Sequence, residues 1–306
     1  MNSFFRGKMH RLPTVLLWLL TASLLTTACK KDDETTTDYT AVDDAAIKKY
    51  LADNSITTAQ KQPSGLYFVP ITTNATAPQA NVKTAASINY TGRLLDGTMF
   101  DTSSKSGSRT SNFVVGNLVY ISGLEEGTSL MHLGDSAVFL VPSRLAFGSN
   151  SNGAIPPNSI LRFNVKLNDV ASSLAIIDDK LIQNYLTVNK ITNAQKQSSG
   201  LYFVPVITNT TATPSATGKT ASVLYTGKLL DGTVFDASSK NGNTPFNFTV
   251  GAGKTILGFD QGISLMHKGD KATLLIPSGL AYGEQGANTI PPNAVLNFDV
   301  EVTDVK

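Results

Sequence analysis

The segment LAYGEQGANTIPPNAVLNFDVEV, residues 280–302, decides the fold of this chain. It starts with an aromatic turn, continues through a loop of small residues into Pro291 and Pro292, and ends in a stretch of alternating polarity. A period of two is typical of a strand with one buried face. The buried face is predicted to consist of Leu296, Phe298, Val300 and Val302.

The same segment occurs earlier in the chain as LAFGSNSNGAIPPNSILRFNVKL, residues 145–167, shifted by 135 positions. This shift aligns residues 43–170 with residues 178–305 without a gap. A period of 20 to 50 residues would indicate a solenoid, whereas this one is long enough for complete domains. We therefore predict one domain at 43–170, a linker at 171–177 and a second domain at 178–306.

Each repeat is predicted to begin with a short amphipathic helix that starts at an Asp, which caps it. Its apolar residues recur at i, i+3 and i+4, which is a helical spacing. They are Ile47, Tyr50 and Leu51 in the first repeat and Ile182, Tyr185 and Leu186 in the second.

The rest of each repeat reads as several strands around one further short helix. SGLYFVP predicts a strand that stops at Pro70 or Pro205, and Asp-Gly at residues 96–97 and 231–232 predicts turns between paired strands. We read Asp96 and Asp231 as turn residues rather than metal ligands. The fold class is therefore α+β, with a mostly antiparallel sheet in each domain.

The charge balance argues against a nucleic-acid interface. The 306 residues include 25 Lys and Arg against 23 Asp and Glu. Three of the basic residues, Arg6, Lys8 and Arg11, lie at the N-terminus, and without them 22 basic residues face 23 acidic ones. Because binding to nucleic acid needs a basic patch, we predict no nucleic-acid partner.

The N-terminus is predicted to direct export. A basic start precedes VLLWLLTASLL at 15–25, followed by small residues and Cys29, the only cysteine. These features are typical of a secretory signal at 1–28, and the apolar run is short for a membrane-anchor helix, the alternative, which needs about 20 residues. Residues 29–42 then read as a flexible tether. A single cysteine cannot form an intrachain disulfide.

The end of this signal resembles a bacterial lipobox, with Thr26 where such motifs usually carry Leu. The resemblance implies lipidation at Cys29. KKDDE at 30–34 resembles the export tags on surface lipoproteins of some Gram-negative groups, or forms a solvated linker. We expect a lipid-anchored protein of the bacterial cell envelope, in the outer membrane and facing the periplasm or the surface.

The second repeat carries apolar and aromatic residues on segments that are predicted to converge on one face of the sheet. Two tyrosines and Asp236 mixed with apolar residues are what a small pocket with polar handles needs, although core packing is the simpler explanation for Phe248 and part of Phe298. His132 and His267 lack the partners of a triad or a metal site, so no metal or cofactor is predicted. The apolar set is Tyr225, Phe235, Phe246, Phe248, Ile256, Phe259, Tyr282, Ile290 and Phe298.

LYTGKLLDGTVFD, PFNFTVG, GFDQG, LAYG and IPPNAVLNFDVEV, in this order and spacing, resemble the FKBP family of peptidyl-prolyl cis-trans isomerases. The resemblance covers about 90 residues of each repeat and leaves the preceding helix and strand as an extension. It implies a curved antiparallel sheet wrapped around a short helix, with the substrate proline in an aromatic pocket. The implied wall is Tyr225, Phe235, Phe246, Phe259, Ile290 and Phe298.

The resemblance also implies polar roles in the second repeat. Asp236 is tied to Tyr225, while the backbone amide of Ile256 and the hydroxyl of Tyr282 donate to substrate carbonyls. Proline-containing polypeptides are the implied clients, and macrolides of the FK506 class are implied inhibitors. The membrane would be reached through the lipid anchor.

The first repeat departs from this pattern at three positions. Leu124 replaces the floor aromatic, Phe147 replaces the tyrosine, and Ser111 stands where the second repeat has Phe246. We expect the second domain to be the working isomerase and the first to be weaker or to bind peptide only. The first pocket keeps Tyr90, Phe100, Asp101, Ile121, Ile155 and Phe163.

Two other functions fit parts of the sequence. Both domains could hold extended clients without isomerising them, as a chaperone or a peptide-binding surface lipoprotein. A surface adhesion or glycan-binding repeat protein would explain the anchor and the duplication. It leaves the joint occurrence of the YTG, LAYG and IPP motifs without an explanation.

We expect Cys29→Ser to release the protein from membranes, because a serine cannot carry the thioether-linked lipid. Fractionation of cells that express either form, followed by immunoblotting, measures this. Membrane association that is unchanged in the serine variant would refute the anchor.

Overall fold

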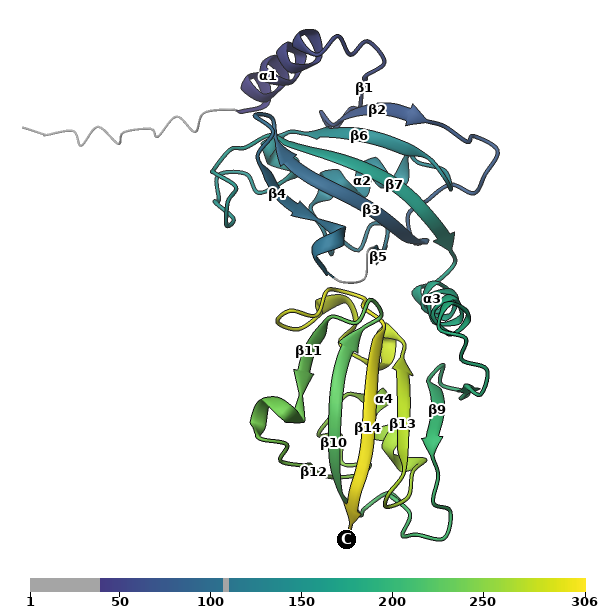
Figure 1. Ribbon diagram of the computed structural model, residues 1–306. Coiled ribbons are helices and arrows are strands. Elements are labelled where there is room, and N and C mark those ends of the chain that lie inside the picture. The colour runs from purple at the N-terminus through teal and green to yellow at the C-terminus, as the bar shows by residue number, and fades with distance from the viewer. Residues whose placement is uncertain (1–38, 107–109) are drawn as a thin grey trace, which may run out of the picture. The chain divides into compact units, whose positions relative to one another are not determined.

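The computed structural model describes residues 39–106 and 110–306 and contains two α+β repeats, as predicted (Figure 1). The predicted signal, Cys29 and residues 30–38 of the tether lie outside the described residues. In the described part of the chain, no helix is both long enough and apolar enough to span a bilayer.

The first repeat forms a seven-stranded antiparallel sheet in the order β1-β2-β6-β7-β3-β4, with β5 also paired to β3. Its helices are α1 (Tyr39–Asp53) and α2 (Ser122–Ser129), with 3-10 turns η1 (Ser103–Ser106) and η2 (Ser143–Leu145). The strands are β1 (Gln60–Lys61), β2 (Tyr67–Thr72), β3 (Ala85–Leu94), β4 (Met99–Thr102), β5 (Ser111–Val114), β6 (Ser136–Val141) and β7 (Leu161–Ala171).

The second repeat has the same topology, β11-β10-β14-β13-β9-β8, with β12 paired to β10. Its helices are α3 (Leu174–Val188) and α4 (Leu257–Ser264), with 3-10 turns η3 (Ser238–Asn241), η4 (Ser278–Leu280) and η5 (Gly283–Gln285). The strands are β8 (Gln195–Lys196), β9 (Tyr202–Ile207), β10 (Thr220–Leu229), β11 (Val234–Ala237), β12 (Phe246–Thr249), β13 (Lys271–Ile276) and β14 (Leu296–Val305).

Strand β14 confirms the predicted alternation and lies between β10 and β13 (Figure 1). Leu296, Phe298, Val300 and Val302 are buried in the core that also contains Phe259 and Ile263 of α4. On the other face Asp299 is exposed, whereas Asn297 is buried and its amide donates to the Tyr185 hydroxyl of α3 at 2.8 Å. Each sheet therefore carries a short helix on one face and the N-terminal helix of its repeat on the other.

The short helix approaches its sheet very closely. A Cβ added at Gly258 would lie 2.3 Å from the side chain of Ile276, and one at Gly262 would lie 2.4 Å from that of Leu274. Real Cβ contacts are never this short, because the atoms would overlap. Glycine at both positions therefore allows α4 to rest directly on β13.

Several predicted boundaries were wrong. Helix α1 begins at Tyr39, inside the predicted tether, while Ala171 ends β7 and α3 begins at Leu174, inside the predicted linker. Pro70 and Pro205, which were predicted to end their strands, lie inside them. Pro70 pairs with Ala137 and β2 continues past it to Thr72, with a shift in register at that point. The shift accommodates a residue that has no amide proton to donate.

The Asp-Gly turns are confirmed. Asp96 accepts a hydrogen bond from the amide of Thr98 at 2.8 Å, and Gly97 adopts a φ of +95°. Asp231 and Gly232 form the equivalent turn in the second repeat, with Asp231 accepting from the amide of Thr233 at 2.9 Å. The carboxylates act in the local turn, as short polar side chains commonly do.

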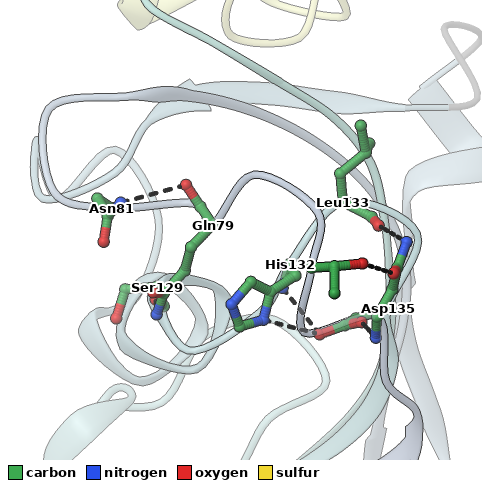
Figure 2. A network of polar contacts seen from close by, with 8 residues as sticks. Gln79, Asn81, Ser129, His132, Leu133 and Asp135 are labelled. Carbon is green, nitrogen blue, oxygen red and sulfur yellow. Dashed lines mark hydrogen bonds and ion pairs between the residues drawn. The ribbon is translucent and has the colours of Figure 1, made fainter.

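His132 lies in a polar turn between α2 and β6 (Figure 2). Asp135 accepts hydrogen bonds from the backbone amides of His132 at 2.8 Å and Asn74 at 2.6 Å, and the His132 ring lies 3.6 Å from the same carboxylate. Gln79 donates to the carbonyl of Ser129 at 2.9 Å. The histidine is half-buried rather than a plain surface residue, and its surroundings are those of a structural turn.

The acidic residues at the predicted helix starts have a different role from capping. Asp43 and Asp178 lie inside α1 and α3. Asp178 accepts hydrogen bonds from the amide and the hydroxyl of Ser278 at 2.8 and 2.7 Å, and Asp43 accepts the same pair from Ser143. These bonds attach each N-terminal helix to the turn just before the aromatic loop.

Burial raises the pKa of Asp178 from 3.8 to about 6, against the opposing hydrogen bonds from Ser278. Its Oδ1 is buried and has no hydrogen-bond partner among the described residues. A carboxyl group that is harder to ionise in the folded state stabilises the fold below its unfolded pKa. That contribution is lost as the pH rises through about 6.

We predict that Asp178→Asn stabilises the protein at pH 8, by up to about 3 kcal/mol, because the amide accepts from Ser278 without a buried charge. The gain should shrink toward zero near pH 4. Thermal unfolding across this pH range measures it. Ser278→Ala, the control, should destabilise the protein at every pH. If Asp178→Asn changed the stability by the same amount at pH 4 and at pH 8, the role of the buried charge would be contradicted.

Candidate functional site

The six wall residues that the resemblance implies, together with the polar positions Asp236, Ile256 and Tyr282, all line one cleft of about 480 Å³ in the second repeat. They come from β10, β11, β12, α4, β14 and the loops beside them. The cleft also includes five residues that were not predicted, because they lie in loops without a periodic pattern. These are Lys254, Thr255, Ala287, Asn288 and Thr289.

The floor of the cleft is a cluster of aromatic rings. Phe259 on α4 and Phe298 on β14 have ring centroids 5.2 Å apart and are 4% and 6% exposed. Tyr225 on β10 lies 6.0 and 6.1 Å from these two rings, and Phe235 on β11 lies 5.5 Å from Phe298. The rings meet mostly edge to face, an arrangement that aromatic pairs favour.

The rim of the cleft is much more open than the floor. Phe246 on β12 is 39% exposed and Tyr282 is 40% exposed. The Phe246 ring stacks on Phe248 at 5.6 Å and meets Tyr225 edge-on at 6.3 Å. Phe248 belongs to the core and does not line the cleft, so core packing was the correct reading there.

Two tyrosine hydroxyls and one carboxylate supply the polar groups. Tyr225 donates to Asp236 at 2.7 Å, and the amide of Ala237 donates to the other oxygen of Asp236 at 2.8 Å. Burial, assisted by Asp236, raises the pKa of Tyr225 to about 12, so its phenol keeps the proton at neutral pH. The Tyr282 hydroxyl belongs to a half-open side chain at the rim, where it can meet a ligand.

The loop after Tyr282 forms a fixed wall that carries Ile290. Ala287 and Ile290 exchange backbone hydrogen bonds of 3.0 and 2.7 Å. Gly286 has a φ of +60°, and a Cβ there would lie 2.5 Å from the carbonyl oxygen of Ile290. Ile256, which also lines the cleft, immediately precedes α4, and its carbonyl accepts hydrogen bonds from the amides of Phe259 and Asp260.

The first repeat places its predicted residues in the equivalent positions with a different floor. Tyr90 donates to Asp101, and Phe163 lies 5.8 Å from Tyr90 and 5.6 Å from Phe100. Leu124, 1% exposed, replaces the central ring. Ile155 is buried in the same core cluster, against which Ile121 and Phe147 also pack.

The first repeat lacks an aromatic ring at Ser111, as expected, but another residue places a ring nearby. The ring of Tyr120, which was not predicted, lies 6.4 Å from that of Tyr90. In the aligned repeat this position is Thr255. The sequence did contain a signal for this ring. Compared with the second repeat, the first has an aromatic residue more at position 120 and one fewer at position 111.

Comparison with known proteins agrees with this geometry. The model of the family FKBP-type peptidyl-prolyl cis-trans isomerase matches residues 77–168 and 211–303. Human Peptidyl-prolyl cis-trans isomerase FKBP9 is 32% identical over 218 residues, which cover 71% of this chain and 34% of that protein. FK506-binding protein 5 of Dictyostelium discoideum is 36% identical over 180 residues, 53% of this chain and 11% of that protein.

Among solved structures, FkpA from Escherichia coli is 35% identical, with a TM-score of 0.38, and the match covers 43% of this chain and 59% of that one. Two tandem family-model matches extend over more than half of the sequence. The chain therefore belongs to the FKBP-type peptidyl-prolyl cis-trans isomerase family. It spans about a third of the length of the human relative.

We predict that Gly227→Ala disrupts the cleft while leaving the sheet intact. A Cβ at this position would lie 2.6 Å from the ring of Phe235 and 2.8 Å from that of Phe298, so both rings must move. The FK506-class macrolides that the resemblance implies as inhibitors serve as the probe, and their affinity for the variant, measured by calorimetry, should be about tenfold or more below that for the unchanged chain.

Gly279→Ala is the matched control for this experiment. A Cβ at Gly279 meets no atom within 4 Å, so the same chemical change should leave the affinity unaltered. Equal affinities of the two variants would show that the macrolide does not bind between Phe235 and Phe298.

Proposed function

We propose that the second domain catalyses cis–trans isomerisation of peptide bonds that precede proline. The observation that supports this most directly is the cluster of Tyr225, Phe259 and Phe298 beneath a rim that carries the Tyr282 hydroxyl. A pyrrolidine ring is apolar and compact, and its neighbouring carbonyls are hydrogen-bond acceptors. The aromatic floor of the cleft can contact the pyrrolidine ring, and the hydroxyl at its rim can donate a hydrogen bond to a carbonyl.

The physical chemistry of the reaction requires little beyond such a cleft. Rotation about the bond must break amide resonance, with a barrier of about 18–20 kcal/mol. The twisted amide lacks the polar resonance form, so a dry aromatic floor favours it over the planar state. Donors at the rim hold the flanking carbonyls in the twisted geometry, which is binding selective for the transition state.

We also propose that the protein assists the folding of exported polypeptides in the cell envelope. The apolar run before Cys29 and the resemblance to a lipobox support this. A lipid anchor would keep the isomerase near polypeptides that are still unfolded. Their prolyl bonds isomerise in tens to hundreds of seconds without a catalyst, which is slow enough to limit folding.

The alternative is binding without turnover, and specific residues favour it for the first domain. Leu124 replaces the central ring and Phe147 lacks the hydroxyl of Tyr282. Both differences weaken the features that favour a twisted amide. We therefore assign turnover to the second domain and peptide binding to the first.

The test is an isomerisation assay on a short proline peptide with the full chain. The double variant Phe259→Leu and Tyr282→Phe converts two positions to the apolar types of the first domain. A lost donor and a lost ring contact are each worth about 1 kcal/mol, so kcat/KM should fall about 10- to 100-fold.

The matched control is Gly92→Ala in the first domain, where a Cβ would lie 2.6 Å from the ring of Phe100. It perturbs the first pocket only and should leave kcat/KM within about twofold. If the control removed most of the activity and the double variant did not, the assignment of turnover to the second domain would be wrong.

A further inference from the structure

The two repeats differ in where one aromatic ring comes from. Ser111 on β5 pairs with Ile88, and Phe246 on β12 pairs with Val223, so both residues occupy the same register of equivalent strands. The first repeat therefore lacks a ring on the strand that supplies one in the second.

Tyr120 supplies a ring from the loop before α2. Its ring centroid lies 5.2 Å from Phe113 and 6.4 Å from Tyr90. In the second repeat, Phe246 lies 5.6 and 6.3 Å from the equivalent rings, Phe248 and Tyr225. The two rings therefore have equivalent neighbours at similar distances. Phe246 stacks on Phe248 with 16° between the ring planes, whereas Tyr120 meets Phe113 edge-on at 63°, so Tyr120 takes over the neighbours of Phe246 in a different orientation.

The loop that carries Tyr120 is held by Glu125 of α2, which is 2% exposed. Its carboxylate accepts hydrogen bonds from the amides of Gly116 and Leu118, at 2.9 and 3.0 Å, and from Tyr120 itself at 3.0 Å. Leu118 adopts a φ of +55°, a conformation that residues other than glycine seldom adopt. The loop is therefore built to present the Tyr120 side chain.

The second repeat holds the same loop differently. The equivalent residue is Asp260, one methylene shorter, which accepts from the amide of Gly251 at 2.7 Å. Gly253, with a φ of +65°, takes the place of Leu118, and Thr255 takes that of Tyr120. Glu125 and Tyr120 thus change together between the repeats.

The small side chain at Ser111 fits this exchange. A phenylalanine there would compete with Tyr120 for the space beside Tyr90. Burial raises the pKa of Tyr120, against the opposing effect of the Ser111 hydroxyl, so the phenol keeps its proton. The rebuilt wall therefore carries a hydroxyl that Phe246 does not have.

We propose that Tyr120, positioned by Glu125, is the aromatic wall of a rebuilt first-domain site that binds a prolyl segment of an extended polypeptide. The nature of the ligand rests on the proposed function of the second domain. The first domain is then a distinct binding site with a phenol in its wall, rather than a decayed copy of the second.

The test uses as its parent the full chain with the second cleft disrupted by Gly227→Ala, whose added Cβ would lie 2.6 Å from the ring of Phe235 and 2.8 Å from that of Phe298. The probe is a fluorescent proline-containing peptide, and its affinity is measured by anisotropy. Tyr120→Thr should weaken binding about tenfold through loss of the ring contacts, and Ser111→Phe should weaken it through crowding. The double variant Ser111→Phe/Tyr120→Thr should recover to within about threefold of the parent, because one ring again fills the place.

Glu125→Asp tests the positioning role and matches the second repeat. It should weaken binding in the parent and have no effect in the Ser111→Phe/Tyr120→Thr background, where the wall no longer depends on the loop. A merely structural role would weaken binding in both backgrounds. Circular dichroism confirms that each variant is folded.

The proposal is overturned if the parent does not bind the peptide, if Tyr120→Thr binds as tightly as the parent, or if the double variant binds as weakly as the poorer single one. These outcomes concern binding by the first domain alone. Turnover by the second domain is measured separately in the chain with an intact second cleft, so failure of either proposal can be told from failure of the other.

Discussion

The close approach of the short helix to the sheet is the constraint on which the rest of each domain depends. Gly258 and Gly262 let α4 rest on β13, and this contact brings Phe259 to 5.2 Å from Phe298 on β14. In the first repeat, a Cβ at Gly123 would lie 2.3 Å from Val141, so the same approach is required there. One packing contact therefore closes the core and creates the floor of the site.

Because this contact depends on the helix glycines, the two repeats can have the same fold and still differ in the side chain that forms the floor of the site. The side chain between the helix glycines is fully enclosed in either repeat, as Leu124 at 1% exposure or Phe259 at 4%. A core tolerates an exchange of apolar groups when the packed volume is maintained. The floor of a ligand site responds more strongly, because only a flat ring offers a face to a pyrrolidine.

The sequence was sufficient for the features that follow a period or a turn rule. The alternation along β14, the Asp-Gly turns and the helix spacing each follow from local chemistry, and the family resemblance located the cleft around Phe259. Contacts between distant segments were not predictable. Asp178 was read as a cap because its partner, Ser278, is 100 residues away, and Pro70 was read as a strand end because a register shift leaves no local signal.

The Tyr120 ring shows why comparing the repeats position by position understates the first site. An aromatic wall is a requirement on a place in space, and the chain can reach that place from β5 or from the loop before α2. The alignment of the two repeats shows an aromatic ring lost at Ser111 and, as a separate change, an aromatic ring gained at Tyr120. Only the distances to Phe113 and Tyr90 show that the gained ring takes over the neighbours of the lost one. Since one place accommodates one ring, a ring removed at Tyr120 leaves a gap and a ring added at Ser111 produces a clash, and the two changes made together should compensate.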